Sequence, residues 1–188
     1  ISVQGATAAY NVVFDHVSVS WALDENASTG YPNTNDITFS NSIIAEGLYR
    51  SIHPDGPHSK GMMIGDHAKN VTVVGNLFAH NQDRNPYVKP GVVAEVVNNV
   101  VYNWGGTSGS NLLNVSNYSN TGASTQLNFT GNYYKPGPQS SLKAPVYGTS
   151  VDAYTRVFVW GNYGPTRTRP TDSEWMISSM VESPFRSA

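Results

Sequence analysis

The 188-residue sequence contains no cysteine, which excludes both disulfide bonds and thiolate metal sites. Charged residues make up only 13% of the chain, whereas an average domain has roughly 25%. The formal net charge is −2, and this lack of surplus Lys and Arg argues against a nucleic-acid partner. Because no stretch approaches the roughly 20 apolar residues that span a bilayer, we expect no membrane partner either.

Amphipathic helices of convincing length are also lacking. Apolar residues instead come in short β-branched runs bounded by Asn and Gly, as they do in strands. Six runs share one pattern, in which two apolar segments are separated by one or two polar or small residues followed by His or Asn. The runs are VVFDHVSV (12–19), ITFSNSII (37–44), VTVVGNLF (71–78), AEVVNNVVY (94–102), QLNFTGNYY (126–134) and VFVWGNYG (157–164).

This shared pattern predicts a structural repeat. A strand–bend–strand unit that recurs at about 20–50 residues is typical of a solenoid. Asn suits the bend because it tolerates the left-handed backbone region, and stacked Asn side chains can hydrogen-bond to one another along the array. The aligned bend residues are His16, Asn41, Asn76, Asn99, Asn132 and Asn162, separated by 25, 35, 23, 33 and 30 residues.

We therefore predict an all-β fold, a parallel β-helix over residues 1–163. An antiparallel sandwich is the alternative, but it should carry several tight hairpin turns, and Asp55-Gly56 is the only Asp-Gly or Asn-Gly pair. Residues 164–188 contain three prolines and no strand-like run. We expect them to form a C-terminal tail that packs along the outside of the solenoid, with Trp175 and Phe185 as anchors.

Ionisable residues concentrate in three loops that follow the first, second and third bends. The loops are SWALDENASTG (20–30), RSIHPDGPHSKGMMIGDH (50–67) and HNQDRNPYVKPG (80–91). Loops that leave the same side of successive coils share one face of a solenoid, so the three loops could form one site.

The adjacent carboxylates Asp24 and Glu25 are candidate ligands for a hard cation such as calcium, which prefers several oxygen ligands. Two solvated loop carboxylates are the alternative. His53 and His58 invite a zinc interpretation, but they lie five residues apart on a Pro-containing loop without a helical His-Glu-x-x-His motif. The spacing therefore argues against zinc.

The third loop predicts an anion site. Pro86 stiffens the backbone just after Arg84. Lys60 and Lys89 would add positive charge, which suits an acidic ligand such as a polyuronate. Aromatic residues that could stack on its sugar rings are Tyr31, Tyr49, Tyr87 and Trp104. The alternative is that Arg84 is a solvated loop cation.

Five segments of the chain resemble the pectate lyases of polysaccharide lyase family 1. They are NVVFDHVSVSWALDE (11–25), IIAEGL (43–48), HSKGMMIGDH (58–67), NVTVVGNLFAHNQDRNP (70–86) and VAEVVNNVVYNWG (93–105). The most specific part is the combination of Asp-His before a Ser-x-Ser-Trp strand with an Arg-x-Pro element. The similarity extends from Ile1 to about Tyr134 and implies a right-handed parallel β-helix.

The resemblance also implies calcium-dependent β-elimination of polygalacturonate, the backbone of pectin, by a secreted monomer. Arg84 takes the position of the catalytic arginine, Lys60 and Lys89 those of substrate ligands, and Asp24 that of a calcium ligand, with Glu25 as a second one. A polygalacturonate hydrolase, which needs two carboxylic acids flanking the scissile bond, and a non-catalytic glycan-binding β-helix are the alternatives.

The chain departs from the family pattern at several positions. Lys89 and Tyr87 stand where arginine is usual or frequent, and Ser28 stands where a second calcium-binding aspartate is expected. Another acidic ligand would fall near Ser2. The N-terminal coils of the family are also absent, so we expect a fragment, or one chain of a cleaved protein whose partner is its own N-terminal segment. Five Asn-x-Ser/Thr sequons make glycosylation a further expectation, at Asn26, Asn70, Asn114, Asn117 and Asn128.

Overall fold

A computed structural model describes residues 1–4, 7–30, 32–105, 113–115, 124–140, 142–147 and 155–178. Apart from one short 3-10 helix, η1 (Glu174–Ile177), the regular structure in these ranges consists of β-strands. Within the same ranges, no helix has the length and apolar character needed to cross a membrane.

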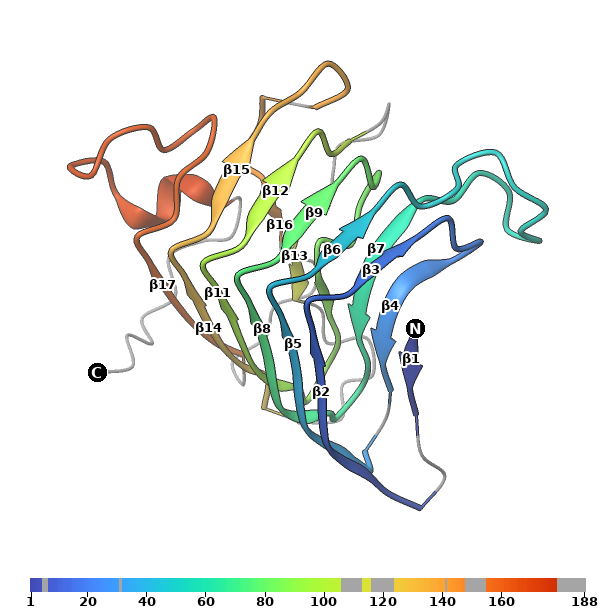
Figure 1. Ribbon diagram of the computed structural model, residues 1–188. Helices are drawn as coiled ribbons and strands as arrows, with labels where there is room; N and C mark the ends of the chain where they lie inside the picture. The colour runs from blue at the N-terminus through green and yellow to red at the C-terminus, as the bar shows by residue number, and fades with distance from the viewer. Residues whose placement is uncertain are drawn as a thin grey trace.

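The strands form three parallel sheets that run along the stack (Figure 1). Sheet A contains β1 (Ser2–Val3), β4 (Glu25–Thr29), β7 (Lys60–Ile64), β10 (Tyr87–Val88), β13 (Leu113–Val115) and β16 (Val146–Tyr147). Sheet B contains β2 (Ala9–Asp15), β5 (Thr34–Ser40), β8 (Lys69–Val74), β11 (Val93–Val97), β14 (Gln126–Thr130) and β17 (Arg156–Trp160). Sheet C contains β3 (Ser18–Ser20), β6 (Ile43–Ala45), β9 (Leu77–Ala79), β12 (Val100–Tyr102) and β15 (Tyr133–Lys135).

Consecutive strands of the chain belong to different sheets, and each strand pairs with the equivalent strand of the next coil. The β5–β8 pair, for example, aligns Ile37 with Val71 and Phe39 with Val73. This arrangement is a parallel β-helix, which confirms the predicted fold class. The antiparallel sandwich is wrong, because every pairing between these strands is parallel.

The core is a set of columns in which equivalent residues of successive coils stack inside the helix. One column of sheet B consists of Phe39, Val73, Val96, Phe129 and Val159, all of them buried. Burying each such side chain contributes about 1.5–3 kcal/mol. Inward and outward positions alternate along β11 and β14. The alternation is not visible as a polar–apolar pattern in the sequence, because the outward, partly exposed positions 93 and 97 also carry Val.

A row of buried asparagines holds the bend between sheets B and C. Asn76, Asn99, Asn132 and Asn162 stack in register, and each of the first three donates its Nδ2 to the Oδ1 of the next at 2.9–3.0 Å. Each Oδ1 in the row also accepts the backbone N–H of the preceding coil, as Asn99 does from Asn76 at 2.9 Å. The predicted asparagine array is therefore confirmed for these four coils.

The first two aligned positions were wrong by one residue. The register places Ser42, and not Asn41, level with Asn76, and the backbone N–H of Ser42 donates to Asn76 Oδ1 at 3.0 Å. His16 and Asn41 belong to the neighbouring row, the residues of left-handed backbone conformation, which continues with Gly75, Asn98, Gly131 and Gly161. The physical reason is that the left-handed position and the stacking position are adjacent residues, and Asn suits both.

The chain after β17 covers the last coil. Arg167 is buried, donates to Asn162 O at 2.7 Å and pairs with Glu174 Oε1 at 2.5 Å. Glu174 Oε2 in turn accepts the backbone N–H of Gly161 at 2.7 Å. This ion pair satisfies backbone groups at the end of the asparagine row. Trp175 packs against the core, as expected of an anchor, whereas Phe185 lies outside the described residues.

Replacing Asn99 with Ala should destabilise the protein by about 3 kcal/mol, because the change removes the hydrogen bonds to two buried backbone groups of the preceding coil, Asn76 N and Val73 O. The urea midpoint measures this effect. The matched control is Asn98→Gly, at the neighbouring exposed position, whose φ of 54° glycine adopts readily. Equal midpoints for the two variants would contradict a structural role for the asparagine row.

Candidate functional site

The candidate site is built on the loops that connect sheet C to sheet A. Residues 21–24, 46–59 and 80–86 leave β3, β6 and β9 on the same side of three successive coils and lead into β4, β7 and β10 (Figure 1). Asp24 and Arg84 lie in these loops, Glu25 and Lys60 are the first residues of β4 and β7, and Lys89 follows β10. The expectation that the three charged segments share one face is therefore confirmed for the parts of them that precede sheet A.

Opposite charges alternate where these loops enter sheet A. Glu25 and Lys60 are register partners in adjacent coils, and Lys60 forms a bridge with Asp83 in the next. Lys60 Nζ donates to Asp83 Oδ2 at 2.8 Å. Burial raises the pKa of the Asp83 carboxyl, and the hydrogen bond from Lys60 partly offsets this effect. The ion pair therefore holds Lys60 in a fixed, largely buried position.

Arg84 reaches back across the coils to the two carboxylates of the first loop. Its Nη1 donates to Glu25 Oε1 and lies 3.6 Å from Asp24 Oδ1. The guanidinium side chain is 29% exposed, so it borders solvent while its charge is balanced by protein groups. The structure thus brings Arg84, Asp24 and Glu25 together, although the sequence predicted them separately as catalytic and metal-binding residues.

The backbone at Arg84 has a left-handed conformation, with φ of 59°, and the following Asn85–Pro86 peptide bond is cis. A left-handed non-glycine residue costs roughly 1–2 kcal/mol, so neighbouring contacts must hold it. Met62 N donates to Arg84 O at 2.6 Å, and Gly61 N donates to Asp83 O at 3.0 Å. Gly61 permits this close approach, because a Cβ there would lie 2.6 Å from Arg84 O.

A second set of buried asparagines connects these loops through hydrogen bonds. Asn26 Nδ2 donates to Asn81 Oδ1 at 3.1 Å, and Asn81 Nδ2 donates to Asn85 Oδ1 at 3.0 Å. Asn26 Oδ1 also accepts Ala22 N at 3.0 Å, and Asn81 Oδ1 accepts Gly47 N at 3.1 Å. The network therefore ties all three loops together. It also buries the sequon asparagine Asn26, which is only 1% exposed.

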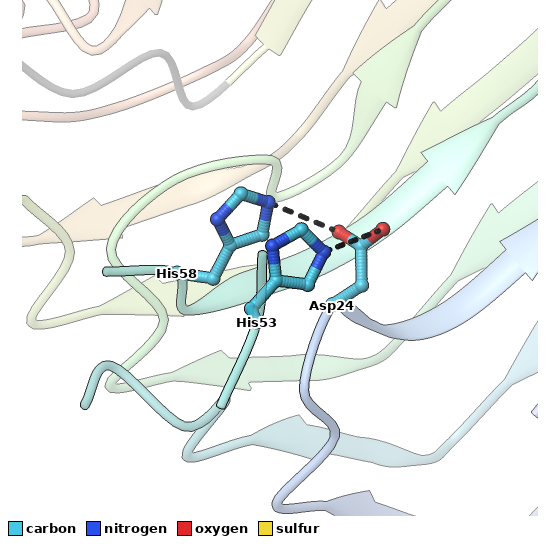
Figure 2. Close-up of side chains that lie close together, drawn as sticks. All are labelled: Asp24, His53 and His58. Carbon is cyan, nitrogen blue, oxygen red and sulfur yellow. Dashed lines mark ion pairs between the residues drawn. The ribbon is translucent and has the colours of Figure 1, made fainter. Parts of the chain in front are cut away.

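Asp24 lies beside two histidines from the second loop (Figure 2). The Nε2 atoms of His53 and His58 lie 3.8 Å and 3.5 Å from the two carboxylate oxygens of Asp24. The imidazole rings stack with their centroids 3.7 Å apart. The sequence did not predict this cluster. His53 and His58 are five residues apart, and this spacing does not reveal that their side chains meet in a loop that folds back on itself.

Lys89 lies at the other end of the site. Its Nζ is 3.6 Å from Asp66 Oδ2 and 5.7 Å from the centre of the Tyr87 ring. Arg84 also lies near that ring, with its Cζ 5.5 Å from the centre. The tyrosine that departs from the family pattern thus connects the two predicted substrate-contacting cations.

The prediction of exposed aromatic platforms is partly wrong. Tyr87 is 7% exposed and Trp104 is fully buried, so neither presents a ring face to solvent. Trp104 packs in the hydrophobic core, and Tyr87 packs near Arg84 and Lys89. Tyr49 is exposed and stays a candidate, and Tyr31 lies outside the described residues.

Ser28 and Ser2 occupy the positions where further acidic calcium ligands were expected from the resemblance. The structure makes them register partners, and Ser28 Oγ donates to Ser2 Oγ at 2.9 Å. The two positions are therefore adjacent in space, but they supply hydroxyl groups in place of carboxylates. Asp24 and Glu25 stay the predicted metal ligands.

Comparisons with known proteins identify relatives of this chain, although no family model matches it. It is 40% identical over 140 residues to a probable pectate lyase C of Aspergillus flavus, an alignment that covers 74% of this chain and 29% of that protein. The corresponding protein of Aspergillus fumigatus is 38% identical over 159 residues, with 85% of this chain and 33% of that protein aligned. One from Emericella nidulans is 40% identical over 161 residues, with 77% and 36% aligned.

The chain spans about a third of the length of these relatives. The fold of the chain agrees with the resemblance noted in the sequence. Over most of its length, therefore, this chain is homologous to the pectate lyases.

Proposed function

We propose that the protein containing this chain is a pectate lyase that cleaves polygalacturonate by β-elimination. The observation that carries the proposal is the placement of Arg84. It extends from a left-handed turn that is hydrogen-bonded to β7, its Nη1 donates to Glu25, and its Cζ lies 5.5 Å from the centre of the Tyr87 ring. A guanidinium group held in this way can approach a sugar ring in one orientation.

Elimination removes the proton on the carbon next to the uronate carboxylate and expels the oxygen on the following carbon. Negative charge then develops beside the carboxylate, so cations that bind this carboxylate lower the barrier. In our proposal Arg84 is the group that accepts this proton. Lys60 and Lys89 bind uronate carboxylates through charge-assisted hydrogen bonds.

Substrate binding would require an exchange of ion pairs. Arg84 is paired with Glu25, Lys60 with Asp83, and Lys89 with Asp66. An acidic substrate could replace the partly exposed Asp66 more readily than Asp83, since the Lys60–Asp83 pair is more buried. Lys89 is therefore the cation that we expect to exchange its carboxylate partner for substrate, whereas Lys60 would bind a uronate while it keeps its pairing with Asp83.

We further propose that calcium assists substrate binding at Asp24. Oδ1 of Asp24 is buried and accepts no hydrogen bond, which fits a carboxylate that offers one oxygen to a cation. Glu25 is engaged by Arg84, so water and uronate oxygens would supply most of the remaining ligands. Calcium bound in this way would neutralise uronate charge and orient the chain.

We propose that the protein is secreted and extracellular, because a polymeric substrate such as polygalacturonate would be cleaved outside the cell. Among the sequon asparagines, Asn70 and Asn128 are exposed on sheet B and could carry glycans, whereas Asn26 is buried. Asn114 and Asn117 have side chains outside the described part of the structure.

Arg84→Lys in the full-length protein should lower the elimination rate by at least about a hundredfold, because lysine places its charge on a different atom and lacks the planar guanidinium. Ultraviolet absorbance of the unsaturated product measures the rate. The matched control is Arg169→Lys, in the exposed C-terminal segment. A near-normal rate in Arg84→Lys would contradict its catalytic role, and a saturated reducing end as the product would indicate a hydrolase.

Asp24→Asn should raise the calcium concentration needed for half-maximal activity by about tenfold, because the variant loses the charged oxygen ligand. Activity measured across a calcium titration with a fixed substrate concentration tests this. Asp55→Asn removes an exposed carboxylate from the second loop and is the control. The calcium role of Asp24 is wrong if both variants keep the wild-type midpoint. Oligogalacturonate binding without turnover by the wild type would favour the non-catalytic alternative.

A further inference from the structure

We propose that Asp24, His53 and His58 form a binding site for a divalent transition-metal ion of the zinc class. Each residue offers one ligand atom, and these atoms lie within 4.8 Å of one another. Figure 2 shows both imidazole rings presenting a nitrogen atom to the same carboxylate. The proposal concerns metal binding and does not depend on lyase activity. Because both ions would use the Asp24 carboxylate, a zinc-class ion would compete with the calcium proposed above.

The distances suit coordination by nitrogen and oxygen. Ligand atoms about 2.1 Å from a tetrahedral zinc ion lie about 3.4 Å from one another. The Nε2 atom of His58 is 3.5 Å from Asp24 Oδ1, and that of His53 is 3.8 Å from Oδ2. Each histidine nitrogen therefore lies near ligand spacing from one oxygen of Asp24, and all three ligand atoms lie within 4.8 Å of one another. The loop would draw the three ligands closer on binding, and water would fill the fourth position.

Two of the polar atoms in the cluster have no hydrogen bond of their own. Asp24 Oδ1 and His58 Nδ1 are both buried without a hydrogen-bond partner. A neutral imidazole that carries its proton on Nδ1 has a free electron pair on Nε2, so His58 can offer Nε2 to a metal. Coordination would also compensate Asp24 Oδ1 for its lost hydration.

His53 must make one exchange to become a ligand. Its Nδ1 lies 3.2 Å from Asp55 N, which donates to it. A neutral imidazole with an accepting Nδ1 carries its proton on Nε2, so metal binding at Nε2 moves that proton to Nδ1 and breaks this bond. The bond is exposed and at the long end of the usual range, which keeps the cost small.

The second loop already holds the two histidines together. His58 N donates to Tyr49 O at 3.0 Å, and Gly56 N donates to His53 O at 3.0 Å. These bonds close the loop on itself, and the two imidazole rings stack on each other. Pre-organised ligands lose less conformational entropy on binding, so the loop favours metal capture.

Local charge also favours a divalent cation. Asp24, Glu25 and Asp83 contribute three carboxylates, and the cations that contact them are Arg84 and Lys60. Arg84 retains its pairing with Glu25 when a metal takes Asp24. Imidazole nitrogens select transition metals, because calcium prefers a shell of oxygen atoms.

The experiment is isothermal titration calorimetry, in which the affinity for Zn²⁺ is measured for the full chain, purified without a histidine tag, and for its variants His53→Gln and His58→Gln. We expect a single strong site in the wild type and affinity lower by about tenfold or more in both variants. His16→Gln is the matched control, because His16 and Asp15 form an exposed His–Asp pair without a second histidine. This variant should bind zinc as the wild type does.

Substituting Co²⁺ for Zn²⁺ gives a second readout, since the intensity of its visible absorption bands reports the coordination geometry around the ion. The wild type should develop the bands, and both loop variants should lose them while keeping the wild-type circular dichroism spectrum. The proposal is overturned if the wild type binds neither ion, or if the loop variants bind as His16→Gln does. Loss of the bands in variants that still eliminate polygalacturonate separates this site from the proposed catalytic function.

Discussion

The register between neighbouring coils is the constraint on which the other features of this molecule depend. Asn76, Asn99, Asn132 and Asn162 each hydrogen-bond to both side chain and backbone of an adjacent coil, so a coil displaced by one residue would lose all of these bonds. Because side chains in a strand alternate between faces, the same slip would also move the core column outward. The loops that form the candidate site owe their alignment to this register.

Much of the fold could be predicted from the sequence because the same types of side chain recur in each coil. Buried Val, Ile and Phe runs recur around an Asn, and their period indicates parallel coils. The one-residue error at Asn41 has a physical origin. Each bend has a left-handed residue followed by a residue of the stacking row. Asn occupies the left-handed position at 41, whereas at 98–99 Asn occupies both positions, so an Asn in the sequence does not show which of the two rows it belongs to.

The candidate site was predictable only where local sequence carries a role. Arg84 before Asn-Pro and the pair Asp24-Glu25 stood out as motifs, whereas contacts between loops left no local signal. The His53–His58 stack depends on a loop that closes on itself. Likewise, the burial of Tyr87 close to both Arg84 and Lys89 follows from coil packing, which no spacing along the chain reveals.

The buried position of Asn26 has a consequence for biosynthesis. Its sequon, Asn26-Ala27-Ser28, is part of β4 and lies inside the finished fold, where its amide group bonds to Ala45 O and Asn81. Oligosaccharide transfer requires an accessible, extended chain, so it could reach this asparagine only before the third coil has closed over it. In a secretory compartment, the order in which the coils assemble would then decide whether this nitrogen ends as a structural donor or as a glycan anchor that prevents the loops from meeting.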